Sequence, residues 1–303
     1  MKNSSLTAVD AQFKHNLDLM NFEPLNKFNH LLRLWRVQGY LDLMWMTQDW
    51  KLFLTYYASD LFLNIAAVTG VLFLAERFDG IGVWTKPQVT FMLGYAMLVR
   101  GIMETLFGYN IFSISRRLGR GQLDHTLVQP HPVWMALLTE GFMPFSGSAS
   151  IIPGLLLLLW SGTVLALDPT ISWLFLALLN VAASATILLS FSFIWGSLAF
   201  WASRATEEIS SSASGLLRTL MPFPLDGLSF AMLSGLMTFL PVGFLAWYPA
   251  RALLGLESDA WSELLTPTVA AIFSIIAVWI FKQGLKAYGR TGSQRYLSFG
   301  HRR

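Results

Sequence analysis

The sequence contains no cysteine, and only 13% of its residues are charged. The absence of cysteine excludes disulfide bonds, thiolate metal sites and a cysteine nucleophile. A soluble domain of ordinary composition carries about 25% charged residues. The shortage of charge, together with 54% hydrophobic residues, therefore indicates a protein that crosses a membrane several times.

Motifs that bind nucleotides or metals are also lacking. The chain has no G-x-x-x-x-G-K-[ST] segment, which would cradle nucleotide phosphates, no G-x-G-x-x-G and no zinc-binding H-E-x-x-H. No apolar segment carries the series of acidic residues that is typical of a proton or sodium relay. We therefore expect no catalytic, metal or cofactor site in this chain, no nucleic-acid partner, and no energy source of its own.

Six apolar segments are long enough to cross a hydrocarbon core about 30 Å thick, which takes about 20 helical residues. They occupy residues 57–76, 88–112, 143–166, 172–200, 227–247 and 266–283. Pro241 in the fifth segment predicts a kink or a break, and we expect a cytoplasmic loop before it at residues 201–224. The sequence therefore predicts an all-α polytopic membrane protein with six transmembrane helices.

The segment before the first span has apolar residues at helical spacing, including Trp35 and Trp45, with charged and polar residues between them. This pattern predicts an amphipathic helix lying in the membrane interface; a cytosolic helix that covers other helices is the alternative. The chain then divides into a mobile cytoplasmic N-terminus (1–29), the interfacial helix (30–51), a six-span domain (52–283) and a basic cytoplasmic tail (284–303).

The basic residues are distributed unevenly over the predicted loops. If both termini are cytoplasmic, 17 of the 21 basic residues lie on the cytoplasmic side and three lie in the outer loops. The three are Arg77, Lys86 and Arg251. The 17 are Lys2, Lys14, Lys27, Arg33, Arg36, Lys51, Arg116, Arg117, Arg120, Arg204, Arg218, Lys282, Lys286, Arg290, Arg295, Arg302 and Arg303. Because cytoplasmic loops are enriched in lysine and arginine, this ratio predicts the orientation.

The second span contains the one remaining basic residue, Arg100, four residues before Glu104 and hence on the same helical face. Charges in lipid must pair or face a polar cavity. Two interpretations stay open: a polar spot on a translocation path or at a subunit contact, and a mutual salt bridge. Gly94, Gly101 and Gly108 recur every seven residues in this span, which predicts a stripe for close helix packing.

Residues 113–134, between the second and third spans, hold three arginines, two histidines, two glycines and two prolines. A passive connection does not need so many polar and turn residues. We interpret the segment as a docking surface for a partner on the cytoplasmic side. A solvated loop that only satisfies the charge asymmetry is the alternative.

Four parts of the chain resemble the ABC-2-type permeases, in particular a six-span group formerly of unknown function. One of these parts, residues 119–130, reads GRGQLDHTLVQP and is similar to the family's cytoplasmic signature G-x-L/F-D-x-x-L-x-x-P. Gln129 departs from the pattern, because a basic residue is expected before the signature proline. The four parts are residues 32–53; residues 80–106; residues 119–130; and residues 223–226 with 239–244 and 247–250.

The resemblance implies the permease subunit of an ATP-driven exporter in the bacterial cytoplasmic (inner) membrane, with both termini cytoplasmic. Such a subunit dimerises with an identical or related copy and binds two separate ABC ATPase subunits, which hold the ATP and the Mg. The resemblance places a coupling helix after the second span. Its expected contacts with the ATPase are Arg116, Arg117, Arg120, Leu123, Asp124, Leu127 and Pro130.

Two other functions remain as alternatives. A self-contained, ion-coupled secondary transporter would need an ion site, for which the Arg100–Glu104 pair is the candidate. A membrane-embedded lipid enzyme is disfavoured, because His, Asp and Glu do not cluster at either end of the predicted spans.

Overall fold

The structure is a computed structural model of the chain and describes residues 24–108, 114–119, 123–129, 131–257, 259 and 261–291. The regular elements in these ranges are all helices. Five of them are long and apolar enough to cross a membrane. They are α3 (Trp50–Arg77), α4 (Lys86–Phe107), α8 (Ile151–Val164) with the preceding turn η2 (Ser146–Ser148), α9 (Ile171–Ser197) and α13 (Ser262–Thr291). The predicted all-α polytopic class is confirmed.

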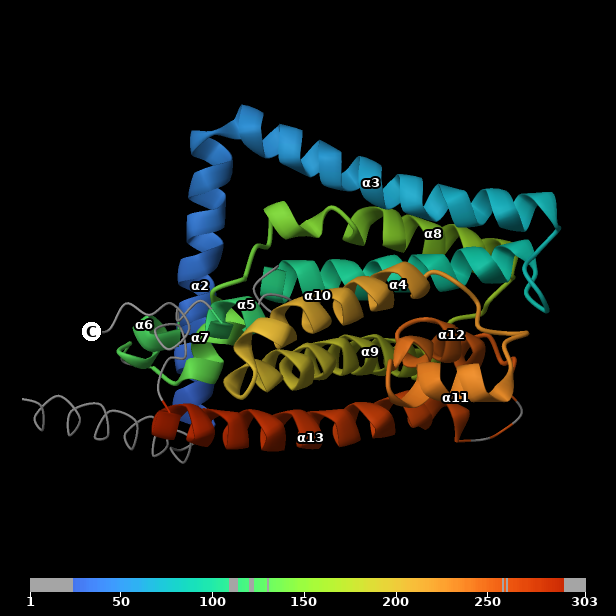
Figure 1. Cartoon of the computed structure of the whole chain (residues 1–303). Coiled ribbons are helices and arrows are strands. Elements are labelled where there is room, and N and C mark those ends of the chain that lie inside the picture. The colour runs from blue at the N-terminus through green and yellow to red at the C-terminus, as the bar shows by residue number, and fades with distance from the viewer. Residues whose placement is uncertain are drawn as a thin grey trace, which may run out of the picture.

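The long helices run side by side in one bundle, in which α8 packs along α4 and α13 packs along α9 (Figure 1). One end of the bundle carries α2 (Pro24–Gln48), which turns across it, and the short helices α5 (Ile114–Gly119), α6 (Leu123–Leu127) and α7 (Val133–Thr139). We call it the α6 end. The opposite end carries the loop at residues 78–85 and α12 (Trp247–Leu253), and we call it the α12 end.

Helix α2 covers the predicted amphipathic segment, and a carboxylate is buried on the side that faces the protein. Asp42 is 8% exposed, and its carboxylate accepts hydrogen bonds from the backbone N–H groups of Phe145 and Ser146 at 2.8 and 3.2 Å. Its apolar side chains divide between two sides: Leu31, Leu34 and Trp35 are half-buried against the protein, and a second set is exposed. The exposed set is Phe28, Leu32, Val37, Tyr40, Leu41 and Met44. Apolar side chains turned away from the protein support a position in the membrane interface.

The contact between α4 and α8 is close because of glycine. A Cβ atom on Gly94 would lie 2.9 Å from the carbonyl oxygen of Gly154, and one on Gly101 would lie 2.6 Å from Cγ1 of Ile151. The third glycine of the stripe, Gly108, follows the last residue of α4 with a φ of +54°, a conformation that favours glycine. The structure thus places two of these glycines between helices and the third at a helix end. Helix α4 ends at Phe107, short of the predicted limit at residue 112.

Helix α10 (Ser203–Leu220) occupies the segment that we expected to be a cytoplasmic loop, so that prediction is wrong. Its 18 residues extend about 27 Å at 1.5 Å per residue, which nearly matches a hydrocarbon core of about 30 Å. Serines and two glutamates keep its hydropathy low, which explains why the sequence pattern missed it. The helix leaves the α6 end and packs against α9.

The predicted fifth span at 227–247 is broken at Pro241, as the proline indicated. Helix α11 (Phe230–Thr238) and the segment Val242–Leu253, which holds the turn η4 (Val242–Phe244) and α12, are bent by 69° around Pro241. Leu253 lies at the α12 end, where its carbonyl oxygen accepts a 2.9 Å hydrogen bond from the indole of Trp173 near the start of α9. Asp226, four residues before α11, accepts a hydrogen bond from Trp84 in the loop at residues 78–85, so the chain before α11 lies at the same end. The bent pair therefore enters and leaves at one end, and α10 makes the crossing.

Asp226 holds the start of this re-entrant segment. Its carboxylate accepts a hydrogen bond from the indole N–H of Trp84, in the loop at residues 78–85, and another at 2.6 Å from the indole of Trp247. It also forms an ion pair with Arg251, whose Nε donates to Glu257 at 2.5 Å. The loop at residues 78–85, the start of the re-entrant segment and α12 thus meet at one carboxylate.

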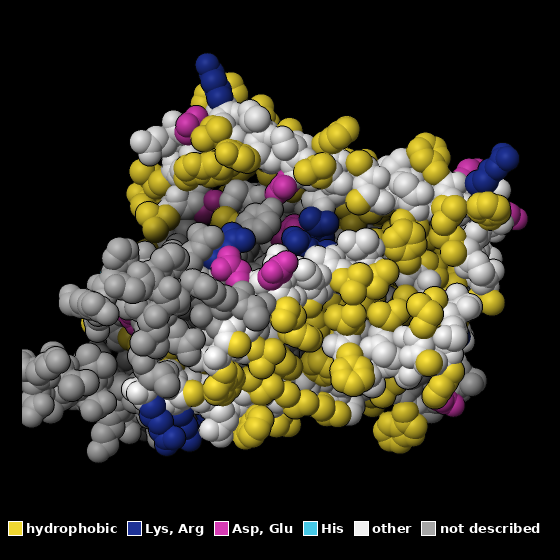
Figure 2. Space-filling view, in the orientation of Figure 1, with side chains coloured by type: hydrophobic (Ala, Val, Ile, Leu, Met, Phe, Trp, Pro, Cys, Tyr) yellow, Lys and Arg dark blue, Asp and Glu magenta, His cyan; other side chains and the backbone are white. Residues whose placement is uncertain are grey.

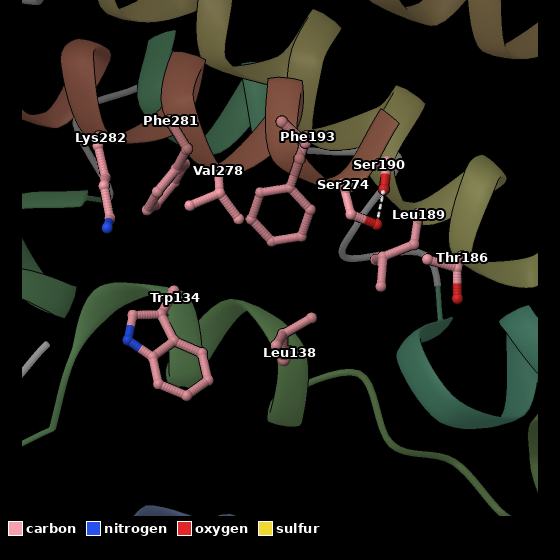
Figure 3. Close-up of a pocket in the computed structure, with 11 residues that line it drawn as sticks. Trp134, Leu138, Thr186, Leu189, Ser190, Phe193, Ser274, Val278, Phe281 and Lys282 are labelled. Carbon is pink, nitrogen blue, oxygen red and sulfur yellow. Dashed lines mark hydrogen bonds between the residues drawn. The ribbon is translucent and has the colours of Figure 1, made fainter. Parts of the chain in front are cut away.

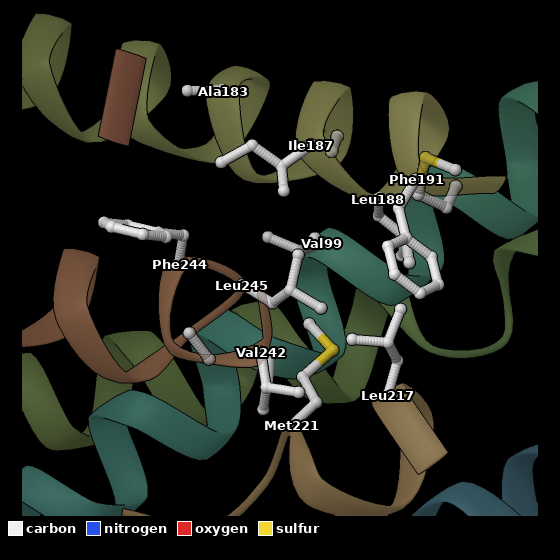
Figure 4. Close-up of a cluster of buried hydrophobic side chains, with 14 of the residues drawn as sticks. Val99, Ala183, Ile187, Leu188, Phe191, Leu217, Met221, Val242, Phe244 and Leu245 are labelled. Atoms are coloured by element: carbon white, nitrogen blue, oxygen red, sulfur yellow. The ribbon is translucent and has the colours of Figure 1, made fainter. Parts of the chain in front are cut away.

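The irregular backbone inside the bundle is hydrogen-bonded to side chains. The carbonyl oxygen of Phe244 accepts a 2.8 Å hydrogen bond from the hydroxyl of Ser184, which lies 3.0 Å from the hydroxyl of Tyr95. Non-helical backbone is tolerated at membrane depth only where protein or water satisfies its polar groups. Around this point α4, α9, α10 and the re-entrant segment form the core, in which Val99, Ile187 and Leu217 meet (Figure 4).

The crossing by α10 changes the charge distribution slightly. Arg218 lies in the last turn of α10, next to Leu217 of the core inside the bundle, and therefore no longer counts toward the α6 end. The division of basic residues becomes 16 to 3 in place of 17 to 3, with Arg100 and Arg218 inside the bundle. The asymmetry that predicts the orientation remains.

The glycine contact predicts a stability difference. Gly101→Ala would place a Cβ 2.6 Å from Cγ1 and 2.9 Å from the backbone nitrogen of Ile151, and overpacking of this kind costs about 1–3 kcal/mol. We expect a lower melting temperature for the purified protein in detergent. Gly162→Ala in α8 is the control, since it meets nothing within 4 Å and alanine favours a helix by about 1 kcal/mol. Equal melting temperatures for the two variants would contradict the close contact.

Candidate functional site

Two arginines of the predicted docking segment form ion pairs within the chain. Arg116 of α5 lies 3.0 Å from a carboxylate oxygen of Glu207, at the start of α10. Arg117 pairs with Glu140, the residue that follows α7, and both side chains are about three-quarters buried. The structure therefore assigns these two arginines to holding α5 against α10 and α7.

Helix α6 contacts the end of α13. Leu123 is 2% exposed, so its side chain faces the chain's own core and not a docking surface. The carboxylate of Asp124 accepts a 2.5 Å hydrogen bond from the hydroxyl of Tyr288, near the end of α13, and Leu127 is half-buried. Arg120 and Pro130, the other two predicted contacts, lie outside the described residues.

The outer side of α6 is the part of the docking segment that remains available. Asp124 and His125 are exposed, and Val128, directly after the helix, is 71% exposed. We call these three residues the α6 face. Val128 was not among the predicted contacts, although an apolar residue directly after a short helix and before Gln129 was a visible signal.

His131 lies beside this face and faces other polar groups. Burial lowers the pKa of its imidazole, and His30, whose ring centre lies 6.2 Å away, lowers it further, while Glu140 opposes the shift. Because the ordinary histidine pKa is about 6.5, His131 is uncharged at neutral pH. His131 therefore adds no positive charge to this end at neutral pH.

Arg100 and Glu104 belong to a hydrogen-bonded chain inside the bundle. The Nε of Arg100 donates to one carboxylate oxygen of Glu104 at 2.8 Å, and the hydroxyl of Ser150 donates to the other at 3.1 Å. Asn64 of α3 donates to Ser150 at 2.8 Å. Asn64 and Glu104 are 4% and 8% exposed. The mutual salt bridge is thus present. Through Ser150 and Asn64, Glu104 also links α4 to α8 and α3.

Glu104 of this pair also borders a cavity of about 660 Å³ between α2, α3 and the segment at residues 140–147. The lining includes four carboxylates, those of Asp42, Asp60, Glu104 and Glu140, and five aromatic rings. Figure 2 shows charged side chains in the hollow between α3 and the rest of the bundle, on a face that is otherwise largely hydrophobic. Both sequence interpretations of Arg100 and Glu104 therefore have a physical basis, since the two side chains pair with each other and Glu104 also faces a polar cavity.

Metal chemistry has no support in the described part of the chain, where no three His, Asp or Glu side chains lie close enough to hold an ion.

Comparison with protein families gave one positive result. A family model described as "ABC-2 family transporter protein" matches residues 61–292, which are 232 of the 303 residues. Neither the curated proteins nor the solved structures gave a match.

The Arg117–Glu140 pair predicts a charge-swap rescue. Arg117→Glu would set two carboxylates against each other and remove a charged hydrogen bond worth about 1.5–3 kcal/mol, so the melting temperature should fall. Adding Glu140→Arg should restore most of it. The same swap at Arg116 and Glu207 is the control and should have a smaller effect, because the Arg116 side chain is 53% exposed. A double variant at 117 and 140 that stays as unstable as the single one would show that the pair does not position α5.

Proposed function

Because the chain belongs to the family of ABC-2 transporter proteins, we propose that it is the membrane-spanning permease subunit of an ATP-driven exporter. In this proposal it pairs with a second permease, identical or related, and couples to two ATPase subunits that hold the ATP and the Mg. Family membership supports a permease component of an ABC transporter. The exposed α6 face and the contacts of α5 and α6 with α10 and α13 support coupling to an ATPase subunit.

The observation that carries the proposal is that the α6 face is exposed while the helices behind it are tied to the crossing helices. Asp124 of α6 is bonded to Tyr288 of α13, and Arg116 of α5 is paired with Glu207 of α10. A solvated loop needs no such ties. A surface that must transmit force needs them, because a push on α6 then reaches α10 and α13.

These ties suggest how ATP would drive transport. Binding of ATP draws the two ATPase subunits together, and each subunit carries the docked α6 face with it. The ion pair and the hydrogen bond pass this movement to the ends of α10 and α13, which tilt as rigid helices and open the bundle to alternate sides. The α6 end would be cytoplasmic in this scheme, as the 16 to 3 division of basic residues predicts.

The exposed side of α10 supports a second copy or an aqueous path beside it. This side carries Ile209 and Leu216 together with a larger set of exposed polar residues, which are Glu208, Ser211, Ser212, Arg218 and Thr219. A carboxylate and a guanidinium are costly against lipid tails, so such a surface favours water or another subunit as its neighbour. We place the substrate path along this side of α10.

The cavity beside Glu104 favours one alternative, a self-contained transporter coupled to an ion gradient. Uptake or export by the purified chain alone in vesicles, driven by a proton or sodium gradient, would establish that alternative and overturn the exporter. The exporter proposal expects transport only when the ATPase subunits and ATP are present.

The docking role predicts the effect of one exposed valine. Val128→Asp should reduce association with the ATPase that co-purifies with the unaltered chain by about tenfold or more, because a charge would be buried at the centre of the contact. Val83→Asp is the matched control, since Val83 is 73% exposed but lies at the α12 end. Binding assays with purified subunits measure both. An unchanged affinity for the Val128 variant, or an equal loss for both, would contradict docking at the α6 face.

A further inference from the structure

A groove of about 380 Å³ separates α7 from the α9–α13 pair. In Figure 3, Trp134 and Leu138 of α7 form one wall, and Phe193, Val278 and Phe281 form the facing wall. Its volume lies within the range of about 300–1,000 Å³ that is usual for ligand sites. The groove is large enough to hold part of a ligand and is lined mostly by hydrocarbon.

The few polar groups in the walls are already bonded within the protein. The hydroxyls of Ser190 and Ser274 lie 3.3 Å apart, and Ser274 also donates to the carbonyl oxygen of Ala270 at 2.7 Å. Thr186 donates to the carbonyl oxygen of Ala182 at 2.7 Å. The hydroxyl protons of these three residues are thus engaged within the protein, and the remaining walls are hydrocarbon, which favours an apolar occupant.

One end of the groove carries an exposed ammonium group. Lys282 lines the groove, and within the part of the chain that the structure describes no carboxylate forms an ion pair with it. Helix α13 starts at Ser262, so Lys282 lies about 30 Å further along the helix, which is the thickness of the hydrocarbon core. The ammonium group thus reaches the level of the lipid headgroups at the α6 end.

We propose that this groove binds one anionic phospholipid from the surrounding bilayer. An acyl chain would pack between Trp134 and Phe193, and the headgroup phosphate would pair with Lys282. An apolar groove with a cation at its headgroup end matches a lipid that has an apolar tail and a negative head. The proposal requires only that the bundle spans a bilayer, so it stands or falls independently of the exporter.

The site would place a lipid against the docking region. Helix α7 follows the α6 face in the chain, and Glu140, which pairs with Arg117, follows α7. A bound acyl chain would pack α7 against α9 and α13 and so fix the region that carries the α6 face. Bilayer composition would then act on the part of the protein that receives the partner.

The test measures the lipid that stays bound to the full-length protein. The protein is reconstituted with equimolar phosphatidylglycerol and phosphatidylcholine, extracted in detergent and analysed by native mass spectrometry. We expect one phosphatidylglycerol to be retained in preference to phosphatidylcholine. Lys282→Gln should reduce the preference about fivefold, the effect of removing one basic residue near an anionic surface. Lys286→Gln is the matched control, because Lys286 is exposed on the same helix but does not line the groove.

A second pair of variants fills the groove without adding charge. Val278→Trp should abolish retention of the lipid, whereas Ile275→Trp should not, because Ile275 is 71% exposed on the same helix and lies outside the groove. Equal retention of the two lipids, equal effects of the two lysine variants, or retention that survives Val278→Trp would overturn the proposal. Retention of a second protein chain in place of lipid, lost with Val278→Trp, would assign the groove to a subunit contact and would also overturn it.

Discussion

The carboxylate of Asp226 is the interaction on which the course of the chain depends. It joins the indoles of Trp84 and Trp247 and the guanidinium of Arg251 at the α12 end. Charged hydrogen bonds contribute about 1.5–3 kcal/mol each, so three donors on one carboxylate fix this point firmly. Since α9 ends at the α6 end, fixing Asp226 at the other end requires the intervening helix, α10, to cross the bundle.

The crossing by α10 explains how the two ends of the molecule are connected. Its first turns carry Glu207, which binds Arg116 of the docking region, and its last turn leads directly to the segment that Asp226 holds. The re-entrant segment then returns to the α12 end after reaching Ser184, whose hydroxyl satisfies the carbonyl of Phe244. One polar helix and the short segment after it thus run from the proposed ATPase contact to the carboxylate of Asp226 at the α12 end.

The apolar helices were predictable from the sequence and the polar one was not. Helices α3, α9 and α13 are long and apolar, so hydropathy alone places them. Helix α10 buries Ser210 and Ser214 against its neighbours, and such residues lower its hydropathy below that of any span. Hydropathy also cannot tell a crossing from a re-entrant pair, because the segments around Pro241 are equally apolar in both. The resemblance supplied the segments that contain Trp84, Asp226 and Trp247, but not their contact, which joins residues 142 positions apart. Of the predicted docking residues, the arginines were recognised for their charge, whereas their carboxylate partners on α10 and after α7 needed the fold.

Labelling of single cysteines in sealed vesicles measures the crossing directly, because the chain has no cysteine of its own. Val83→Cys marks the α12 end, Val128→Cys marks the α6 end, and Ser229→Cys lies three residues after Asp226; all three positions are exposed. We expect a membrane-impermeant maleimide to label the cysteines at positions 83 and 229 from one side and the cysteine at position 128 from the other. Labelling at position 229 from the same side as position 128 would show that α10 does not cross and that the segment after Asp226 does.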